Sequence, residues 1–157
     1  MKIRDAAPAD AAAACEVLRA SITELCVADH RNDPAILAAW LANKRPEVVA
    51  RWATEPGSSL LLAVEGEAVL AVGGVNDSGE ITLNYVAPAA RFRGASSAML
   101  GALEARAAGR GNTRCKLLST ETAHRFYLSR GYRDDGAPQG KFGTNSSYPM
   151  FRLIAPV

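Results

Sequence analysis

The stretch that decides the fold is LNYVAPAARFRGASSAML, residues 83–100. A strand is expected to end near Val86, because Pro88 has no N–H to continue a ladder, and a helix is expected to begin around Ala95, after a loop with two arginines and Gly94. The first turn of a helix has unpaired N–H groups at the positive end of its dipole, which suits an anion. The residues fit a cradle for a diphosphate, and they fit equally well an ordinary strand-to-helix turn with two solvated arginines.

This loop differs from two common phosphate-binding patterns. It has neither the Gly-Lys-Ser/Thr ending of a P-loop nor the three glycines of a dinucleotide-binding turn. It offers instead two guanidinium groups, Arg91 and Arg93, and small residues after Gly94 that allow an anion to approach the backbone. A nucleoside triphosphatase or a nicotinamide enzyme is therefore not favoured.

Outward from this loop, the apolar spacing changes from helical to strand-like and back. Helices are predicted at 11–26, 34–41, 48–52, 96–107 and 120–130, and the carboxylate of Asp10 is expected to cap the first of them. Strands are predicted at 3–5, 59–64, 68–75, 80–86, 115–118, from 132 onward and at 147–153. Residues 135–146 are rich in Gly, Pro, Asn and Ser and are expected to form a loop. Strand runs mixed with helices predict an α/β fold with a mixed, largely antiparallel central sheet of about seven strands and helices on both faces.

Composition places the chain among ordinary globular proteins. Its 157 residues predict one domain, residues 1–157, and the net charge of +2 disfavours a dedicated nucleic-acid binder. Cys15, Cys26 and Cys115 form no close pair and no metal-ligand spacing, so we expect core residues in a reducing cytoplasm and no metal site. The Ala-rich start is too short for a signal core, and no apolar run is long enough to span a membrane.

Two motifs resemble those of one enzyme family. Arg-x-x-Gly-x-Ser, from Arg91 to Ser96, resembles the acetyl-CoA signature of the GCN5-related N-acetyltransferase (GNAT) superfamily, with Ser96 where the family has glycine or alanine. The stretch from Thr120 to Tyr132 resembles the second motif of that family, with Thr120 in place of the common asparagine. The order of the predicted elements is similar along nearly the whole chain.

The resemblance implies a sheet that splays between its fourth and fifth strands, and direct attack of a primary amine on acetyl-CoA held there. The N–H of Val86 is expected to polarise the thioester carbonyl, and Tyr127 to protonate the departing thiolate. A phenol, with a reference pKa near 10, is a competent donor for that step. The residues that the resemblance assigns to the cofactor are Tyr85, Val86, Arg91, Phe92, Arg93, Gly94, Ala95, Ser96, Ser97 and Thr120.

The general base is less sharply marked. Glu80 is in register with the base carboxylate of the histone-acetylating branch of the family, which implies a second catalytic residue beside Tyr127. It also directly follows the turn at residues 77–79, a position that fits an exposed carboxylate without a role. Thr82 and Asn84 share a strand face with Glu80 and offer an alternative, a water held between them that carries the proton.

The acceptor site is expected along the helix-to-helix segment near residues 24–40. Glu24, Asp29, His30 and Asn84 are the residues assigned to the acceptor, and Asp33 and Trp40 lie on the same expected wall. The acids suggest attraction of a cationic amine. A solvated loop histidine and acids that serve only solubility are the alternatives.

These observations predict an acetyl-CoA-dependent N-acetyltransferase that acts on a small-molecule or peptide amine in the cytoplasm. The alternative is a CoA-binding sensor or interaction domain with the same fold and no turnover. The expected partners are acetyl-CoA and the amine, with no nucleic acid and no membrane. A homodimer is compatible with an open edge on the last strand.

Overall fold

The computed structural model describes residues 1–155, and of Asn145 the backbone only. The strands are β1 (Lys2–Asp5), β2 (Ser58–Glu65), β3 (Ala68–Asn76), β4 (Ile81–Val86), β5 (Arg114–Ser119), β6 (Arg133–Asp134), β7 (Gln139–Lys141) and β8 (Thr144–Leu153). The helices are α1 (Ala11–Leu25), α2 (Val27–His30), α3 (Pro34–Leu41), α4 (Pro46–Trp52), α5 (Ala95–Gly109) and α6 (His124–Ser129), with 3-10 turns η1 (Pro8–Asp10) and η2 (Pro88–Ala90).

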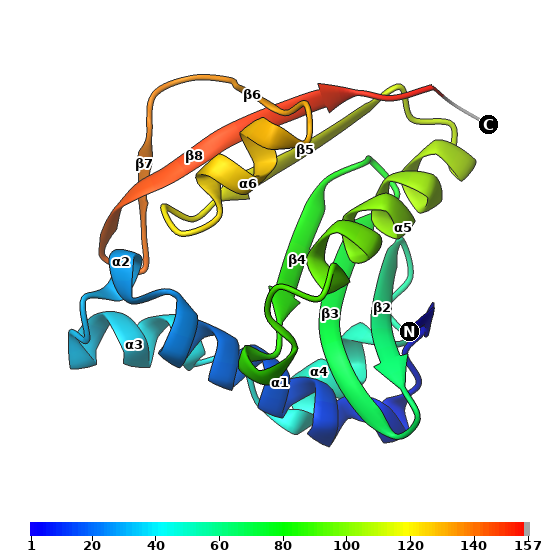
Figure 1. The fold of residues 1–157 in the computed structure, drawn as a ribbon, viewed down its shortest axis with the longest axis horizontal. Coiled ribbons are helices and arrows are strands. Elements are labelled where there is room, and N and C mark those ends of the chain that lie inside the picture. The colour runs from blue at the N-terminus through cyan, green and yellow to red at the C-terminus, as the bar shows by residue number, and fades with distance from the viewer. Residues whose placement is uncertain (156–157) are drawn as a thin grey trace.

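The strands form two sheets that meet at one end and diverge at the other. The first has the order β1-β2-β3-β4, and the second has the order β5-β8-β6, with β7 paired to β8. Within residues 1–155, β4 and β5 are joined by the parallel bridge between Glu80 and Lys116, where the Lys116 N–H donates to Gly79 O at 3.1 Å. Figure 1 shows the two strands separating from there into a V. The predicted mixed, largely antiparallel sheet, splayed between its fourth and fifth strands, is confirmed.

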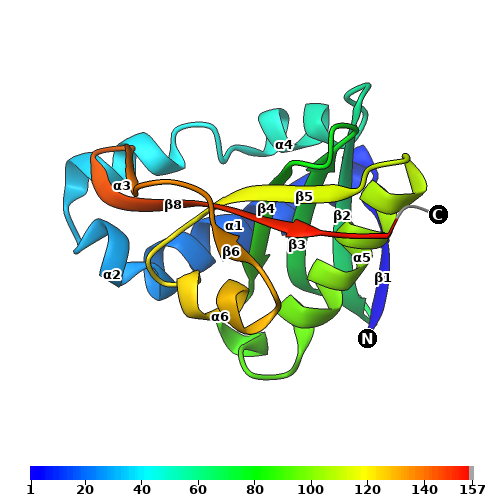
Figure 2. The ribbon, with the colours of Figure 1, turned by 90° about the horizontal axis from the view of Figure 1, so that it is seen from above.

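Helices cover both faces of the first sheet because its strands alternate between two apolar cores. Ala71 of β3 packs in the core that contains Met99 and Leu103 of α5, whereas Val72 packs in the core of α1 and α4. Figure 2 shows α5 and α4 on opposite sides of β2, β3 and β4. Helix α5 lies very close to β3: a Cβ at Gly73 would lie 2.5 Å from the Met99 sulfur, so any larger residue there would force the Met99 side chain to move.

Three local predictions differ from the structure. Helix α6 begins at His124 rather than Thr120, because residues 120–123 form a turn in which Thr120 Oγ1 accepts the N–H of Ala123 at 3.1 Å. The expected loop at 135–146 contains β7 and the first residues of β8. The Asp10 carboxylate does not cap α1; it accepts the N–H of Ala7 at 2.8 Å, within η1.

The three cysteines are buried free thiols, as expected of core residues. No helix in residues 1–155 is both long enough and apolar enough to cross a membrane.

Candidate active site

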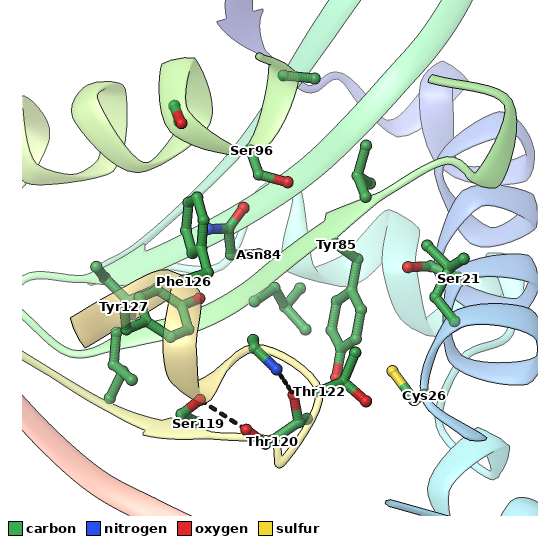
Figure 3. Close-up of a pocket in the computed structure, with 18 of the residues that line it drawn as sticks. Ser21, Cys26, Asn84, Tyr85, Ser96, Ser119, Thr120, Thr122, Phe126 and Tyr127 are labelled. Carbon is green, nitrogen blue, oxygen red and sulfur yellow. Dashed lines mark hydrogen bonds between the residues drawn. The ribbon is translucent and has the colours of Figure 1, made fainter. Parts of the chain in front are cut away.

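A cavity of about 510 Å³ occupies the V between the two sheets. Its walls come from β4, from the loop and first helical turn at residues 90–97, from the end of β5 with the following turn, and from α6. The C-terminal end of α1 closes one side through Ser21, Leu25 and Cys26. Figure 3 shows these side chains arranged around the open space.

One edge of β4 faces this cavity with its backbone. The N–H of Ala87 donates to Leu70 O at 2.8 Å, toward β3. Hydrogen-bonded pairs alternate along an antiparallel ladder, so the N–H of Val86 points to the opposite edge, which borders the cavity. A ligand with an amide or thioester carbonyl can therefore pair with β4 as an added strand does.

The N-terminus of α5 enters the same cavity. Gly94, with φ +80°, is the residue before the helix, and it makes no side-chain cap, so the N–H groups of Ala95, Ser96 and Ser97 have no partner from that residue. The first intrahelical bond runs from Ala98 N to Gly94 O at 3.0 Å. These amides and the dipole favour an anion at this point.

The cations near this helix differ from those expected. Arg91 lines the cavity, but Arg93 donates to Glu65 Oε1 at 2.7 Å, an ion pair that lowers the pKa of Glu65, and it does not line the cavity. Arg130, the residue after α6, lines it instead, and its Nη2 donates to Ser97 Oγ at 2.6 Å. Phe92, which also lines the cavity, is 92% exposed.

Tyr127 and Asn84 meet inside the cavity. Tyr127 is 6% exposed, and burial raises the pKa of its phenol to about 12, against a smaller opposing effect of a hydrogen bond with Asn84. Asn84 Oδ1 is buried and has no hydrogen-bond partner among the described residues. Figure 3 shows both side chains beside Phe126 at the same end of the cavity. The site thus combines a neutral phenol with an unused hydrogen-bond acceptor, and a buried acceptor without a partner favours a ligand that donates to it.

The wall toward α1 is uncharged. The hydroxyl of Tyr85 accepts the Trp40 Nε1–H at 3.3 Å, and burial raises the pKa of Tyr85 far above its ordinary value. Burial also raises the pKa of the nearby Cys26 thiol to about 12. Both groups are therefore neutral at physiological pH, and this side of the cavity offers hydroxyl, thiol and apolar contacts.

Thr120 and Glu80 lie at two different ends of β5. Thr120 lines the cavity, but its hydroxyl oxygen accepts the Ala123 N–H in the turn before α6. Glu80 lies at the vertex of the V, where its Oε1 accepts a hydrogen bond from Asn76 Nδ2 at 3.2 Å. Glu80 is not among the cavity-lining residues.

Three residues expected at the acceptor site have other surroundings. His30 is fully buried: its Nε2 lies 2.9 Å from Ile22 O, and its Nδ1 accepts the Asn32 N–H at 2.9 Å. This network assigns the neutral ring with the proton on Nε2, and leaves no ring nitrogen for an acceptor. Asp29 accepts hydrogen bonds from the segment after β5, and Glu24 is exposed outside the cavity. The expected acidic wall is therefore not formed.

Comparison with known proteins identifies a family. The family model described as "Acetyltransferase (GNAT) domain" matches residues 22–150. No curated protein sequence matches the chain.

Solved structures share the fold. A GCN5-related N-acetyltransferase from Rhodopseudomonas palustris superposes with a TM-score of 0.86 at 22% identity, covering 98% of this chain and 95% of that one. The PaiA N-acetyltransferase from Thermoplasma acidophilum, in complex with coenzyme A, superposes with a TM-score of 0.82 at 16% identity, with 98% of each chain covered. An aminoglycoside 6'-N-acetyltransferase complexed with coenzyme A superposes with a TM-score of 0.74 at 17% identity, covering 100% of this chain and 99% of that one.

Proposed function

Because the chain belongs to the acetyltransferase (GNAT) domain family, we propose that it transfers the acetyl group of acetyl-CoA to a primary amine of a small molecule or peptide. The observation that carries this proposal is the buried pair of Tyr127 and Asn84, beside the cavity-facing edge of β4. The coenzyme A bound to two of the structures that share the fold supports the choice of donor.

The donor's phosphates fit the N-terminus of α5. The amides of Ala95, Ser96 and Ser97 supply hydrogen bonds, and Arg91 and Arg130 supply charge at the same mouth of the cavity. The rest of the donor then follows the edge of β4 into the V. There the N–H of Val86 donates to the thioester carbonyl and stabilises the oxyanion that forms on attack.

The proposed reaction makes one bond and breaks one. The amine nitrogen bonds to the carbonyl carbon, the carbon–sulfur bond breaks with its electron pair on sulfur, and the nitrogen loses a proton while the sulfur gains one. Tyr127 donates to the sulfur as the bond breaks, and a pKa of about 12 supports this role because the phenol stays protonated at neutral pH. Its proton is restored from water.

The proton on nitrogen leaves through water in this proposal. Asn84 lines the cavity, and rotation of its amide would bring the unpartnered Oδ1, which is buried, to the attacking amine or the water beside it. Glu80, at the vertex and outside the cavity lining, takes part only as a more distant acceptor along such a water chain. The primary amine must reach the site neutral, since an alkyl ammonium has its lone pair blocked.

The test separates binding from turnover. We expect acetyl-CoA to bind the wild-type protein, seen by calorimetry, and a panel of primary amines to release CoA thiol. In Tyr127→Phe we expect kcat to fall by about 10²- to 10⁴-fold with CoA affinity retained. Tyr148→Phe is the matched control, because Tyr148 bonds Glu121 outside the cavity. Binding without thiol release from any amine would identify a CoA-binding module instead.

A further inference from the structure

A second cavity, of about 270 Å³, lies on the α4 side of the first sheet. Its floor includes Gly74 of β3 with Thr82 and Leu83 of β4, and its roof is Phe142, between β7 and β8. Thr82 and Leu83 also line the first cavity, so the two cavities lie against the same stretch of β4. Neither the family motifs nor the Tyr127 site accounts for this second space.

Lys44 is the unusual residue of this cavity. It is 5% exposed, and its Nζ has neither a hydrogen bond nor an ion pair within the described part of the chain. Its nearest recorded contact is the Phe142 ring, with the centroid 5.5 Å from Nζ. Burying most of a lysine side chain without an anionic partner for its ammonium is unfavourable. Burial and the charge of Lys141 lower the pKa of Lys44 to about 8, which reflects the same missing partner.

A second ammonium lies against the same ring. Lys141 Nζ is 5.2 Å from the Phe142 centroid, and Lys141 also lines the cavity. Phe142 is held by stacking on Trp40, with centroids 5.9 Å apart and planes 16° from parallel. The carboxylate among the lining residues is Glu55, which is exposed and forms no ion pair with either lysine among residues 1–155. Two cations thus converge on one space that no described carboxylate neutralises by an ion pair.

From this arrangement we infer that the second cavity binds an anionic oxygen group, a carboxylate or a phosphate, of the amine acceptor, with Lys44 and Lys141 as its partners. The inference rests on the proposed acetyltransferase function and names its substrate class, an amine that also carries an acid. It replaces the cationic acceptor that the acids of the helical segment suggested. Asp29 is used within the protein, and Asp33 caps α3 by accepting the Ala35 N–H at 2.9 Å.

The placement of the two cavities supports this reading. The anion sits beside the lysines on one side of β4, and the amine reaches past Thr82 and Leu83 toward the donor on the other side. An ammonium bound to an anion in a poorly hydrated site makes a strong, charge-assisted hydrogen bond. A neutral analogue of the same shape leaves Lys44 without a partner, so the site discriminates against it.

The test compares matched acceptors by release of CoA thiol. The series contains amino acids, their primary amides, aminoalkyl phosphonates and diamines of equal chain length. We expect kcat/KM at least about tenfold higher for the carboxylates or the phosphonates than for the amides, and the better of the two acids identifies the anion. Lys44→Met should abolish this preference, and Lys2→Met, an exposed lysine on β1, should keep it.

Lys141→Gln should also reduce the preference for acidic acceptors. Because Lys141 is exposed, this variant tests the site even if the variant at the buried Lys44 does not fold. Equal turnover of acids and amides, or a preference that survives both lysine substitutions, would overturn the inference. If no amine is acetylated, the proposed function fails. The anion site is then tested separately, by ligand binding. Titration with an N-acetyl amino acid should then shift the side-chain NMR signals of Lys44 and Lys141 but not Lys2, and no shift at millimolar ligand would also overturn the site.

Discussion

The carboxylate of Asp29 accepts hydrogen bonds from both the hydroxyl of Thr122, at 2.6 Å, and its backbone N–H, at 3.2 Å. The other carboxylate oxygen accepts the N–H of Glu121 at 2.7 Å. Asp29 belongs to α2, and the two donors follow β5, so the contact joins the two halves of the fold across the open side of the V (Figure 1). The bridge between Glu80 and Lys116 closes the V at the other end.

We expect Asp29→Ala to lower the free energy of unfolding by about 2–4 kcal/mol, because it leaves two backbone N–H groups and a hydroxyl without an acceptor. Urea unfolding at neutral pH measures the loss. Asp33→Ala, which removes the cap of α3, is the control and should cost about 1 kcal/mol. Equal losses in the two variants would mean that the contact does not clamp the sheets.

At the donor site, Gly94→Ala should weaken CoA binding and lower stability by about 1–2 kcal/mol. Gly94 has φ +80°, a conformation that a side chain strains, and relief of that strain would displace the first amides of α5. The matched control is Gly101→Ala, within the same helix at an exposed position. It should raise stability by about 0.5–1 kcal/mol and leave CoA affinity unchanged; calorimetry and thermal unfolding distinguish the two variants.

Lys44→Met should make the ligand-free protein more stable at pH 7, by about 2–3 kcal/mol. The pKa of Lys44 falls from 10.5 to about 8 in the folded state, so folding disfavours its charged form, with Lys141 adding repulsion and Glu55 exposed at the rim. The free-energy cost of burying the Lys44 ammonium is complete below pH 8. It decreases between pH 8 and pH 10.5, because the lysine is then neutral in the folded protein and loses its proton in the unfolded chain as well. Unfolding measured across that range should show the advantage of Lys44→Met shrinking as pH rises; a loss of stability at pH 7 would contradict it.

The ion pair of Arg4 and Asp10 should stabilise the folded protein at neutral pH and lose this effect in strong acid. The Arg4 guanidinium, followed by the N–H of Ala7, lowers the pKa of Asp10 from 3.8 to about 2. A lowered folded-state pKa stabilises the protein above the unfolded value, and the contribution is lost as pH falls from about 4 to about 2. Asp10→Asn should therefore be less stable than wild type at pH 7, with the gap closing over that interval. A difference in stability between wild type and Asp10→Asn that stays constant from pH 4 to pH 2 would show that the Asp10 carboxyl is not the titrating group.

The backbone of the donor site was predictable because it depends on local sequence. Pro88 ends β4, and Gly94 supplies the left-handed residue before α5, so the strand, loop and helix follow from residues 83–100 alone. The β2–β3 hairpin around Gly66 follows in the same way, from two apolar runs and one turn. The splay between β4 and β5 came from the family resemblance and not from spacing.

Partners far apart in the chain were not predictable. Arg93 carries the right charge at the expected place, yet it pairs with Glu65 on the neighbouring hairpin, and Arg130 takes the position beside α5. His30 and Asp29 looked like polar loop residues, whereas their hydrogen bonds lie within the protein core. Lys44 and Lys141 lie almost a hundred residues apart, so only the packing of Phe142, between β7 and β8, against Trp40 of α3 reveals their shared cavity.

The two cavities have just Thr82 and Leu83 in common among their lining residues. Substitutions in the segments that carry Lys44, Lys141 and Phe142 therefore leave the amides of α5 and the phenol of Tyr127 untouched. A fold arranged in this way allows acceptor preference to diverge in evolution, or to be redesigned, while the donor half stays constant. We therefore expect substitutions on the Lys44 side of β4 to change acceptor preference, and substitutions on the Tyr127 side to impair the proposed transfer itself.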